Sequence, residues 1–307
     1  MQHSNIDRRH FIKLAGLGGA VFASGLPGWA GAQTSPAMGL RGSNTAEDFL
    51  FVQLSDTHWG FKGAPNPDAG GTLQKAIAAV NELAVQPDFV IFTGDLTHTT
   101  DDPAERRRRL AEFKDIAAAL KVKDVKFIPG EHDASLDRGK AYSEFFGKTY
   151  YTFNHKGVHF ITLDNVSDPA ASIGAEQLTW FKSELDKLDK ETRIVVFTHR
   201  PLFDLMPSWD WATRDGAKAV EMLMPFKNAT VFYGHIHQEH HHTTGHIAHH
   251  AAKSLIFPLP APGSQPKRTP LDWNPAQPYN GLGFRQVNAK PAAYQFDLVE
   301  LPVVKKA

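Results

Sequence analysis

The pattern of apolar and polar positions predicts buried strands that alternate with helices. Five short runs rich in β-branched, aromatic and leucine residues have the composition of buried parallel strands. They are Phe49 to Ser55, residues 89–93, Val125 to Pro129, Arg193 to Thr198 and Ala229 to Tyr233. Apolar residues recur at helical spacing between them, as in Thr72 to Val85 and Gly174 to Leu188. The alternation predicts βαβ units and an α/β fold.

Each of these runs is followed by acidic or histidine residues. They are Asp56 and His58, then Asp95, then Glu131, His132 and Asp133, then His199, and finally His235 and His237. Ligands of open α/β sheets bind outside the carboxyl ends of the strands, so we expect these side chains to meet at one edge. Asp95, directly after a strand and Gly94, is expected to be displayed at the surface there.

The order of these motifs resembles that of the calcineurin-like metallophosphoesterase family. The motifs are Asp56-x-His58, Gly94-Asp95, Gly130-x-His132-Asp133, His199 and Gly234-His235-x-His237. The resemblance runs from about Phe49 to Thr243. It implies a mixed β-sandwich flanked by helices, of the α+β type, with a dinuclear metal centre at the carboxyl ends of the strands.

The resemblance also implies a role for each residue. Asp56, His58 and His237 would bind one ion, His199, His235 and residue 131 the other, and Asp95 would bridge them. Imidazole and carboxylate suit two transition-metal ions such as Mn, Fe or Zn. Ions ~3.5 to 4 Å apart can clamp a phosphoryl group and generate a bridging hydroxide that attacks phosphorus. His132, held by Asp133, would donate a proton to the leaving oxygen or stabilise the transition state.

The expected function is therefore metal-dependent hydrolysis of a small phosphomonoester or phosphodiester. The segments His199-Arg200-Pro201 and Gly234 to Glu239 are similar to the cyclic-nucleotide phosphodiesterase branch of the family. A metallo-β-lactamase type of hydrolase would need a His-x-His-x-Asp-His motif, which we do not find.

Glu131 departs from the family pattern, which has Asn at this position. An ionised Glu131 removes one positive charge from the centre, which should tighten the second ion and weaken its pull on phosphate. A second interpretation therefore stays open. In it, the chain is an exported, non-catalytic metal-binding protein whose centre is silenced by Glu131.

The first residues carry a different kind of signal. Asp7-Arg8-Arg9-His10-Phe11 resembles a twin-arginine export signal, and small residues follow at Ala30-Gly31-Ala32. We expect a signal peptide at residues 1–32, a linker at 33–48 and one catalytic domain at 49–307. The expected location is the periplasm or the medium, with the twin-arginine machinery as a partner. Glycine and proline interrupt the apolar stretch, which is shorter than the ~20 residues of a spanning helix, so no stable membrane anchor is expected.

Composition limits the partners and the ligand chemistry. Lys plus Arg and Asp plus Glu both number 33, so the net charge is zero and no nucleic acid partner is expected. The chain has no cysteine, which excludes disulfides and thiolate ligands.

Histidine, arginine and tryptophan residues outside the motifs have simpler explanations. Six of the 16 histidines surround Thr243-Thr244-Gly245, where we expect a solvated hairpin in preference to an auxiliary metal site. The run Arg106 to Arg109 is expected on a solvated helix in preference to a docking patch for polyanions. Loop packing is expected, in preference to stacking on an aromatic or nucleobase group, for Trp59, Phe61, Trp209 and Trp211. His98 is expected to lie beside the ligands without binding metal.

Overall fold

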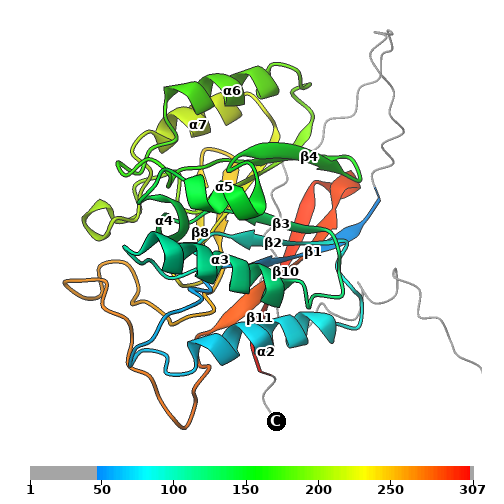
Figure 1. Ribbon diagram of the computed structural model, residues 1–307. Helices are drawn as coiled ribbons and strands as arrows, with labels where there is room; N and C mark the ends of the chain where they lie inside the picture. The colour runs from blue at the N-terminus through cyan, green and yellow to red at the C-terminus, as the bar shows by residue number, and fades with distance from the viewer. Residues whose placement is uncertain (1–46, 305–307) are drawn as a thin grey trace, which may run out of the picture.

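Two stacked β-sheets form the centre of the molecule (Figure 1). The computed structural model describes residues 47–304, so the predicted signal peptide and nearly all of the linker lie outside it. The first sheet runs in the order β11 (Gln295–Pro302), β10 (Gly283–Lys290), β1 (Phe49–Leu54), β2 (Phe89–Thr93) and β3 (Val125–Ile128). The second runs β4 (Tyr151–His155), β5 (Val158–Thr162), β6 (Arg193–Phe197), β7 (Asn228–Tyr233), β9 (Ile247–Ala251) and β8 (His240–Thr244).

Both sheets are mixed, and their central strands are parallel. Strand β1 pairs in parallel with β2, and β2 with β3, whereas β10 runs antiparallel to β1. In the second sheet β5, β6, β7 and β9 pair in parallel, and β4 and β8 form antiparallel edges. The carboxyl ends of β1, β2 and β3 therefore lie side by side in one sheet, and those of β6 and β7 in the other.

Helices cover the outer face of each sheet. Figure 1 shows α2 (Ala69–Asn81), α3 (Pro103–Ala117) and α5 (Lys140–Phe146) on one side, and α6 (Ala175–Leu185) and α7 (Gly216–Leu223) on the other. The short helices are α4 (Glu131–Ala134), η1 (Pro207–Trp209) and η2 (Pro291–Ala293). Separate apolar clusters fill the two sheet–helix layers. The predicted sandwich flanked by helices is confirmed. Among the described residues no helix is long and apolar enough to cross a membrane.

Phenylalanine rings fill the space between the sheets. Phe51 of β1 stacks on Phe89 of β2 with ring centroids 4.9 Å apart, and meets Phe197 and Phe232 of the other sheet edge to face at 5.9 and 5.6 Å. Offset stacking and edge-to-face contact are the arrangements that aromatic rings favour, and each ring buries a large apolar area. This layer fixes the two sheets against one another and so fixes the distance between their carboxyl edges.

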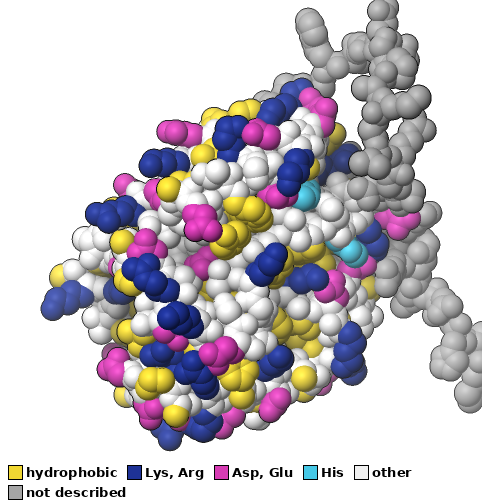
Figure 2. All heavy atoms as spheres, turned by 45° about the horizontal axis from the view of Figure 1, so that its top comes forward, with side chains coloured by type: hydrophobic (Ala, Val, Ile, Leu, Met, Phe, Trp, Pro, Cys, Tyr) yellow, Lys and Arg dark blue, Asp and Glu magenta, His cyan; other side chains and the backbone are white. Residues whose placement is uncertain are grey.

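The arginine run shows how helix α3 is anchored. The Asp102 carboxylate accepts hydrogen bonds from the backbone N–H of Ala104 and Glu105, which with Pro103 explains where the helix begins. Arg107 and Arg108 are exposed and pair with Glu144 and Glu105. Figure 2 shows basic and acidic side chains interspersed over one face of the molecule. The expectation of a solvated face is wrong for Arg106, which is buried and pairs with Asp137 at 3.0 Å.

The histidine-rich segment is a hairpin, as expected, formed by β8 and β9. His242 pairs with His249 and His241 with His250, so alternation sends the rings to both faces. The expectation that it is solvated is wrong for His249 and His250, which are buried. The reason is that β9 pairs with β7 inside the sheet, and Phe203 covers the ring of His249.

Candidate metal centre

Five loops meet where the carboxyl ends of the two sheets converge. Three hydrogen bonds join the sheets directly below them: Gln53 Nε2 donates to the Tyr233 carbonyl at 3.0 Å, His199 Nδ1 to the Thr93 carbonyl at 2.7 Å, and the His235 N–H to the Asp56 carboxylate at 3.1 Å. The site is therefore shared between the sheets and belongs to neither one alone.

The structure gathers the seven predicted ligands into two groups. One is Asp56, His58 and His237, and the other is Asp95, Glu131, His199 and His235. Within each group the donor atoms lie within 4.8 Å of one another. Asp95 Oδ2 is 3.4 Å from His58 Nε2 and also 3.4 Å from His199 Nε2, so this carboxylate lies between the groups. This is the division that the motif resemblance implies, with Asp95 in the bridging position.

Backbone carbonyls hold three of the four histidine rings in a defined tautomer. His199 Nδ1 donates to the Thr93 carbonyl at 2.7 Å, His235 Nε2 to the Asp210 carbonyl and His237 Nδ1 to the Phe257 carbonyl, both at 2.9 Å. In each ring the other nitrogen faces the carboxylates of the centre. When such a ring is neutral, it presents an unprotonated nitrogen inward, which is the state that binds a metal ion.

The turns that carry the ligands use unusual backbone conformations. Asp56, His58, Asp95, His235 and His237 all have positive φ angles, between 45° and 66°. Gly94 also has positive φ, and a Cβ on it would lie 2.3 Å from His199 Nδ1. Residues held in such conformations cluster at functional sites, where surrounding contacts compensate for the strain.

Carboxylates dominate the charge of the centre. Burial and the neighbouring Glu131 oppose ionisation of Asp95, but His199, His132 and His58 lower its pKa to about 2. Burial also opposes ionisation of Glu131, yet His235 and His199 hold its pKa well below its usual range. His199 Nε2 and Glu131 Oε2 are buried and have no hydrogen-bond partner among the described residues, although they lie 3.0 Å apart. Such a donor set fits transition-metal ions, which would satisfy these atoms.

Asp95 is buried, with 1% of its surface exposed, so the expectation that it is displayed is wrong. A carboxylate at the end of a single strand would be exposed to solvent. In the structure the edges of two sheets converge, and loops from the other strands cover the carboxylate. Its Oδ1 accepts a hydrogen bond from the His132 N–H at 2.9 Å, which leaves Oδ2 facing the histidines.

The predicted pairing of Asp133 with His132 is also wrong. Asp133 accepts hydrogen bonds from the backbone N–H groups of Leu96, Thr97 and Gly130, at 2.8 to 2.9 Å. It thereby supports the loop that carries Asp95, and burial together with the Asp95 charge raises its pKa to about 7. His132 is positioned differently: its Nδ1 accepts the N–H of Thr99 at 3.1 Å. The neutral ring therefore carries its proton on Nε2.

Two supporting residues were not predicted from the motifs. Asn165 accepts hydrogen bonds from the N–H groups of His199 and Arg200 and donates to the Arg200 carbonyl, so it shapes the turn that carries His199. Asn165 follows soon after the buried strand β5, the same signal that marked the ligands. Arg200 lies with its Nε 3.7 Å from Glu131 Oε2, a contact between loops that the sequence does not reveal.

The fold and the site together define a metallophosphoesterase whose seven predicted ligands form two groups. The sequence profile of the calcineurin-like phosphoesterase family matches residues 49–239, and the chain belongs to this family.

Curated relatives agree with this assignment, and a solved structure shares the fold. A protein of Arcobacter nitrofigilis named "Probable glycerophosphodiester phosphodiesterase GpdQ" is 31% identical over 167 residues, which cover 50% of this chain and 57% of that protein. A "Probable cyclic nucleotide phosphodiesterase" of Rhodopseudomonas palustris is 25% identical, covering 70% of this chain and 84% of that one. A purple acid phosphatase from yellow lupin (Lupinus luteus) seeds shares the fold with a TM-score of 0.60 at 14% identity, over 85% of this chain and 52% of that one. The chain thus spans a little over half the length of the Arcobacter protein.

Proposed function

We propose that the protein is a metal-dependent phosphoester hydrolase that uses two transition-metal ions, Mn, Fe or Zn. The observation that supports this most directly is the position of Asp95 Oδ2, 3.4 Å from one histidine of each ligand group. Asp56, His58 and His237 would hold one ion and Glu131, His199 and His235 the other, with Asp95 shared. Bound ions would supply Lewis-acid activation of the phosphoryl group and of water.

His132 would act as the proton donor to the leaving group. His132 lies beside the first ligand group, its ring centroid 4.6 Å from that of His58. Because Thr99 donates to His132 Nδ1, the Nε2 proton is free to pass to the leaving oxygen as the ester bond breaks. A single proton donor beside a phosphoryl site is sufficient for either a monoester or a diester.

Small phosphodiesters are the favoured substrates. Two relatives carry names of phosphodiesterases, one of glycerophosphodiesters and one of cyclic nucleotides. Hydrolysis of a chromogenic phosphodiester and the matching monoester by protein loaded with Mn²⁺, Zn²⁺ or Fe²⁺ tests the proposal. We expect turnover that requires metal and disappears in Asp95→Asn. Metal binding without turnover of either ester would favour the second candidate.

That second candidate is a non-catalytic metal-binding protein, and the position of Glu131 favours it. Glu131 Oε2 is 3.0 Å from His199 Nε2 and Oε1 is 3.0 Å from His235 Nδ1, so both oxygens face the second group. A carboxylate that binds an ion through both oxygens would occupy a position that substrate or water needs. The hydrolase remains our proposal because His132 and the bridging carboxylate are retained.

We further propose export through the twin-arginine route, on the basis of Arg8 and Arg9. Cell fractionation of the native host protein and of a variant with both arginines changed to lysine tests this. We expect the wild-type protein in the periplasm or medium and the variant in the cytoplasm. Equal distribution of the two would contradict the proposal.

A further inference from the structure

His58 differs from the other three candidate histidine ligands in what holds its outer nitrogen. His199, His235 and His237 each donate to a backbone carbonyl. His58 Nδ1 instead lies 3.2 Å from Nδ1 of another side chain, His98. Its Nε2 faces His237 Nε2 at 3.3 Å and Asp95 Oδ2 at 3.4 Å, inside the centre. A ring whose Nε2 binds an ion keeps a proton on Nδ1 and needs an acceptor there.

We propose that His98 is a positioning residue that accepts the Nδ1 proton of His58 and thereby fixes this ligand's tautomer and orientation. Two imidazoles can share one hydrogen bond only if one ring donates and the other accepts. Since His58 must present an unprotonated Nε2 to the ion, His58 is the donor and His98 carries its own proton on Nε2. His98 therefore does for His58 what the carbonyls do for the other three rings.

The surroundings of His98 hold it in this position. Its backbone N–H donates to the Trp59 carbonyl at 2.8 Å, and its carbonyl accepts from Arg109 Nη1 at 2.8 Å. The Arg109 side chain crosses Gly60, where an added Cβ would lie 2.7 Å from it. Phe61 packs edge to face on the His98 ring with centroids 5.0 Å apart. The ring is thus fixed from both its backbone and its edge.

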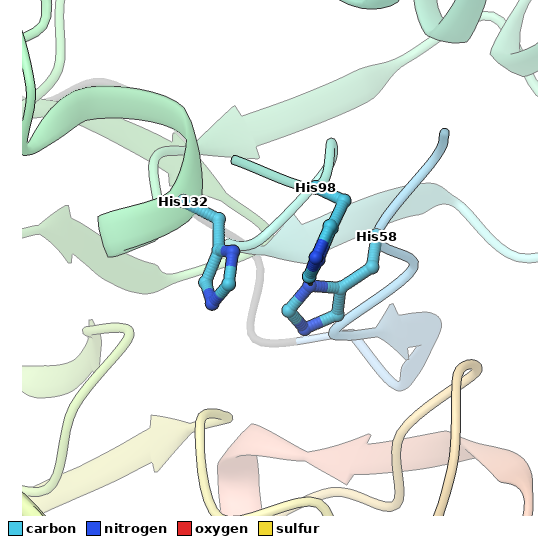
Figure 3. A group of neighbouring side chains, drawn as sticks. All are labelled: His58, His98 and His132. Atoms are coloured by element: carbon cyan, nitrogen blue, oxygen red, sulfur yellow. Dashed lines mark hydrogen bonds between the residues drawn. The ribbon is translucent and has the colours of Figure 1, made fainter. Parts of the chain in front are cut away.

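The same segment also sets the proposed proton donor. Thr99, the next residue, donates its N–H to His132 Nδ1, and the rings of His98 and His132 stack with centroids 4.9 Å apart. Figure 3 shows His58 and His98, from the segments after β1 and β2, and His132, from helix α4, reaching toward a common region. Residues 98 and 99 therefore orient one ligand and the donor together.

A pair of substitutions tests the role of His98. Asn places an acceptor oxygen close to the position of Nδ1, whereas Leu has a similar bulk and no acceptor. We expect His98→Leu to weaken the binding of one of the two ions by roughly 10- to 100-fold, as is usual for loss of such a partner. The affinity for the other ion should stay within about twofold of the wild-type value. His98→Asn should recover most of the affinity. Calorimetric titration of metal-free protein with Mn²⁺ or Zn²⁺ measures both sites without any assay of turnover.

The ion site that His98→Leu affects is identified in a variant in which one of the two sites is already disrupted. His237→Ala removes a ligand from the same group, so adding His98→Leu should not weaken the remaining ion further. His159→Leu, whose ring bonds Asn154 on another part of the surface, is the matched control and should leave both affinities unchanged. If His98→Leu does not fold by circular dichroism, His98→Ala replaces it in the same comparison.

Three results would overturn the proposal. Equal weakening by Leu and Asn would mean that the acceptor does not matter, and equal weakening of both ions would indicate a general structural effect. Binding of three ions by wild type and two by His98→Leu would make His98 a ligand. The role of His98 rests on the proposed metal centre. If the protein bound both ions but hydrolysed no ester, these titrations would still test that role.

Discussion

At the scale of single residues, the centre depends on side chains placed by strained turns. Five of the seven candidate ligands adopt left-handed backbone conformations, which cost roughly 1 to 2 kcal/mol for a residue other than glycine. Hydrogen bonds between adjacent turns compensate, for example from the His58 N–H to the Asp95 carbonyl at 2.9 Å. The ligands are therefore positioned before an ion binds.

His132 provides a test of proton donation. His132→Ala should lower turnover by roughly 10²- to 10⁴-fold because the Nε2 donor is lost. Metal content should be nearly unchanged, because the contact of residue 132 with Asp95 comes from its backbone N–H, which alanine keeps. Kinetics and elemental analysis on one preparation measure both, with His159→Ala as a control. Loss of an ion with the ring would show that His132 is a ligand.

Glu131 provides a test of charge in the second group. Glu131→Asn should weaken the second ion by about tenfold or more, since it removes a carboxylate 3.0 Å from both His199 Nε2 and His235 Nδ1. The saturated variant should polarise phosphate more strongly and turn over faster with divalent metal. Titration and hydrolysis at saturation measure affinity and rate separately. Glu131→Gln keeps the length of the side chain and removes its charge, so it separates the effect of charge from that of side-chain length. Unchanged affinity for the second ion in both variants would refute the charge argument.

At the scale of elements, the strands and their exit turns were predictable, but contacts between loops were not. The alternation of buried runs with helices identified β1, β2, β3, β6 and β7 and the residues that follow them. The partner of Asp133 was not predictable, because it depends on how the Asp95 loop lies against α4 in space. The burial of His249 was missed for a related reason: alternation predicts which face a ring lies on, but not what covers that face.

The hairpin of β8 and β9 should make stability depend on pH. Burial, with a contribution from His242, lowers the pKa of His249 to about 3, whereas an unfolded histidine titrates near 6.5. Between these values the unfolded chain binds the proton and the folded chain does not. The stabilisation is therefore complete above about pH 6.5 and falls by about 1.4 kcal/mol per pH unit below it.

Urea unfolding of wild type and His249→Leu at pH 7.5 and pH 5 isolates this contribution. The leucine variant should lose less stability on acidification, by roughly 2 kcal/mol. It should also be no less stable at pH 7.5, because both ring nitrogens of His249 lack hydrogen-bond partners among the described residues. Parallel losses in the two proteins would contradict the prediction.

At the scale of the whole molecule, the centre makes stability depend on metal. Ligands come from both sheets, so unfolding of either sheet dismantles both ion sites. An ion that binds only the folded state stabilises it by about 2.7 kcal/mol when present at 100 times its Kd. Removal of metal with a chelator should therefore lower Tm, and added Mn²⁺ or Zn²⁺ should restore it.

Calorimetry with and without chelator measures this effect. A variant with both His235→Ala and His237→Ala loses one ligand from each group and is the control, because its Tm should respond little to chelator. An equal response of variant and wild type would show that the stabilising ions bind elsewhere.

The sharing of the centre between the sheets has a further consequence for chain topology. His58 and His237 lie 179 residues apart in sequence, yet their Nε2 atoms are 3.3 Å apart. An ion held by both would join segments that are far apart in the chain, and if it binds only the folded chain it stabilises that state by mass action. The chain has no cysteine, so coordination would join these distant segments where no disulfide can. Unlike a disulfide, the complete ligand set would exist only after both sheets have docked, so coordination would stabilise the finished fold without linking the unfolded chain covalently.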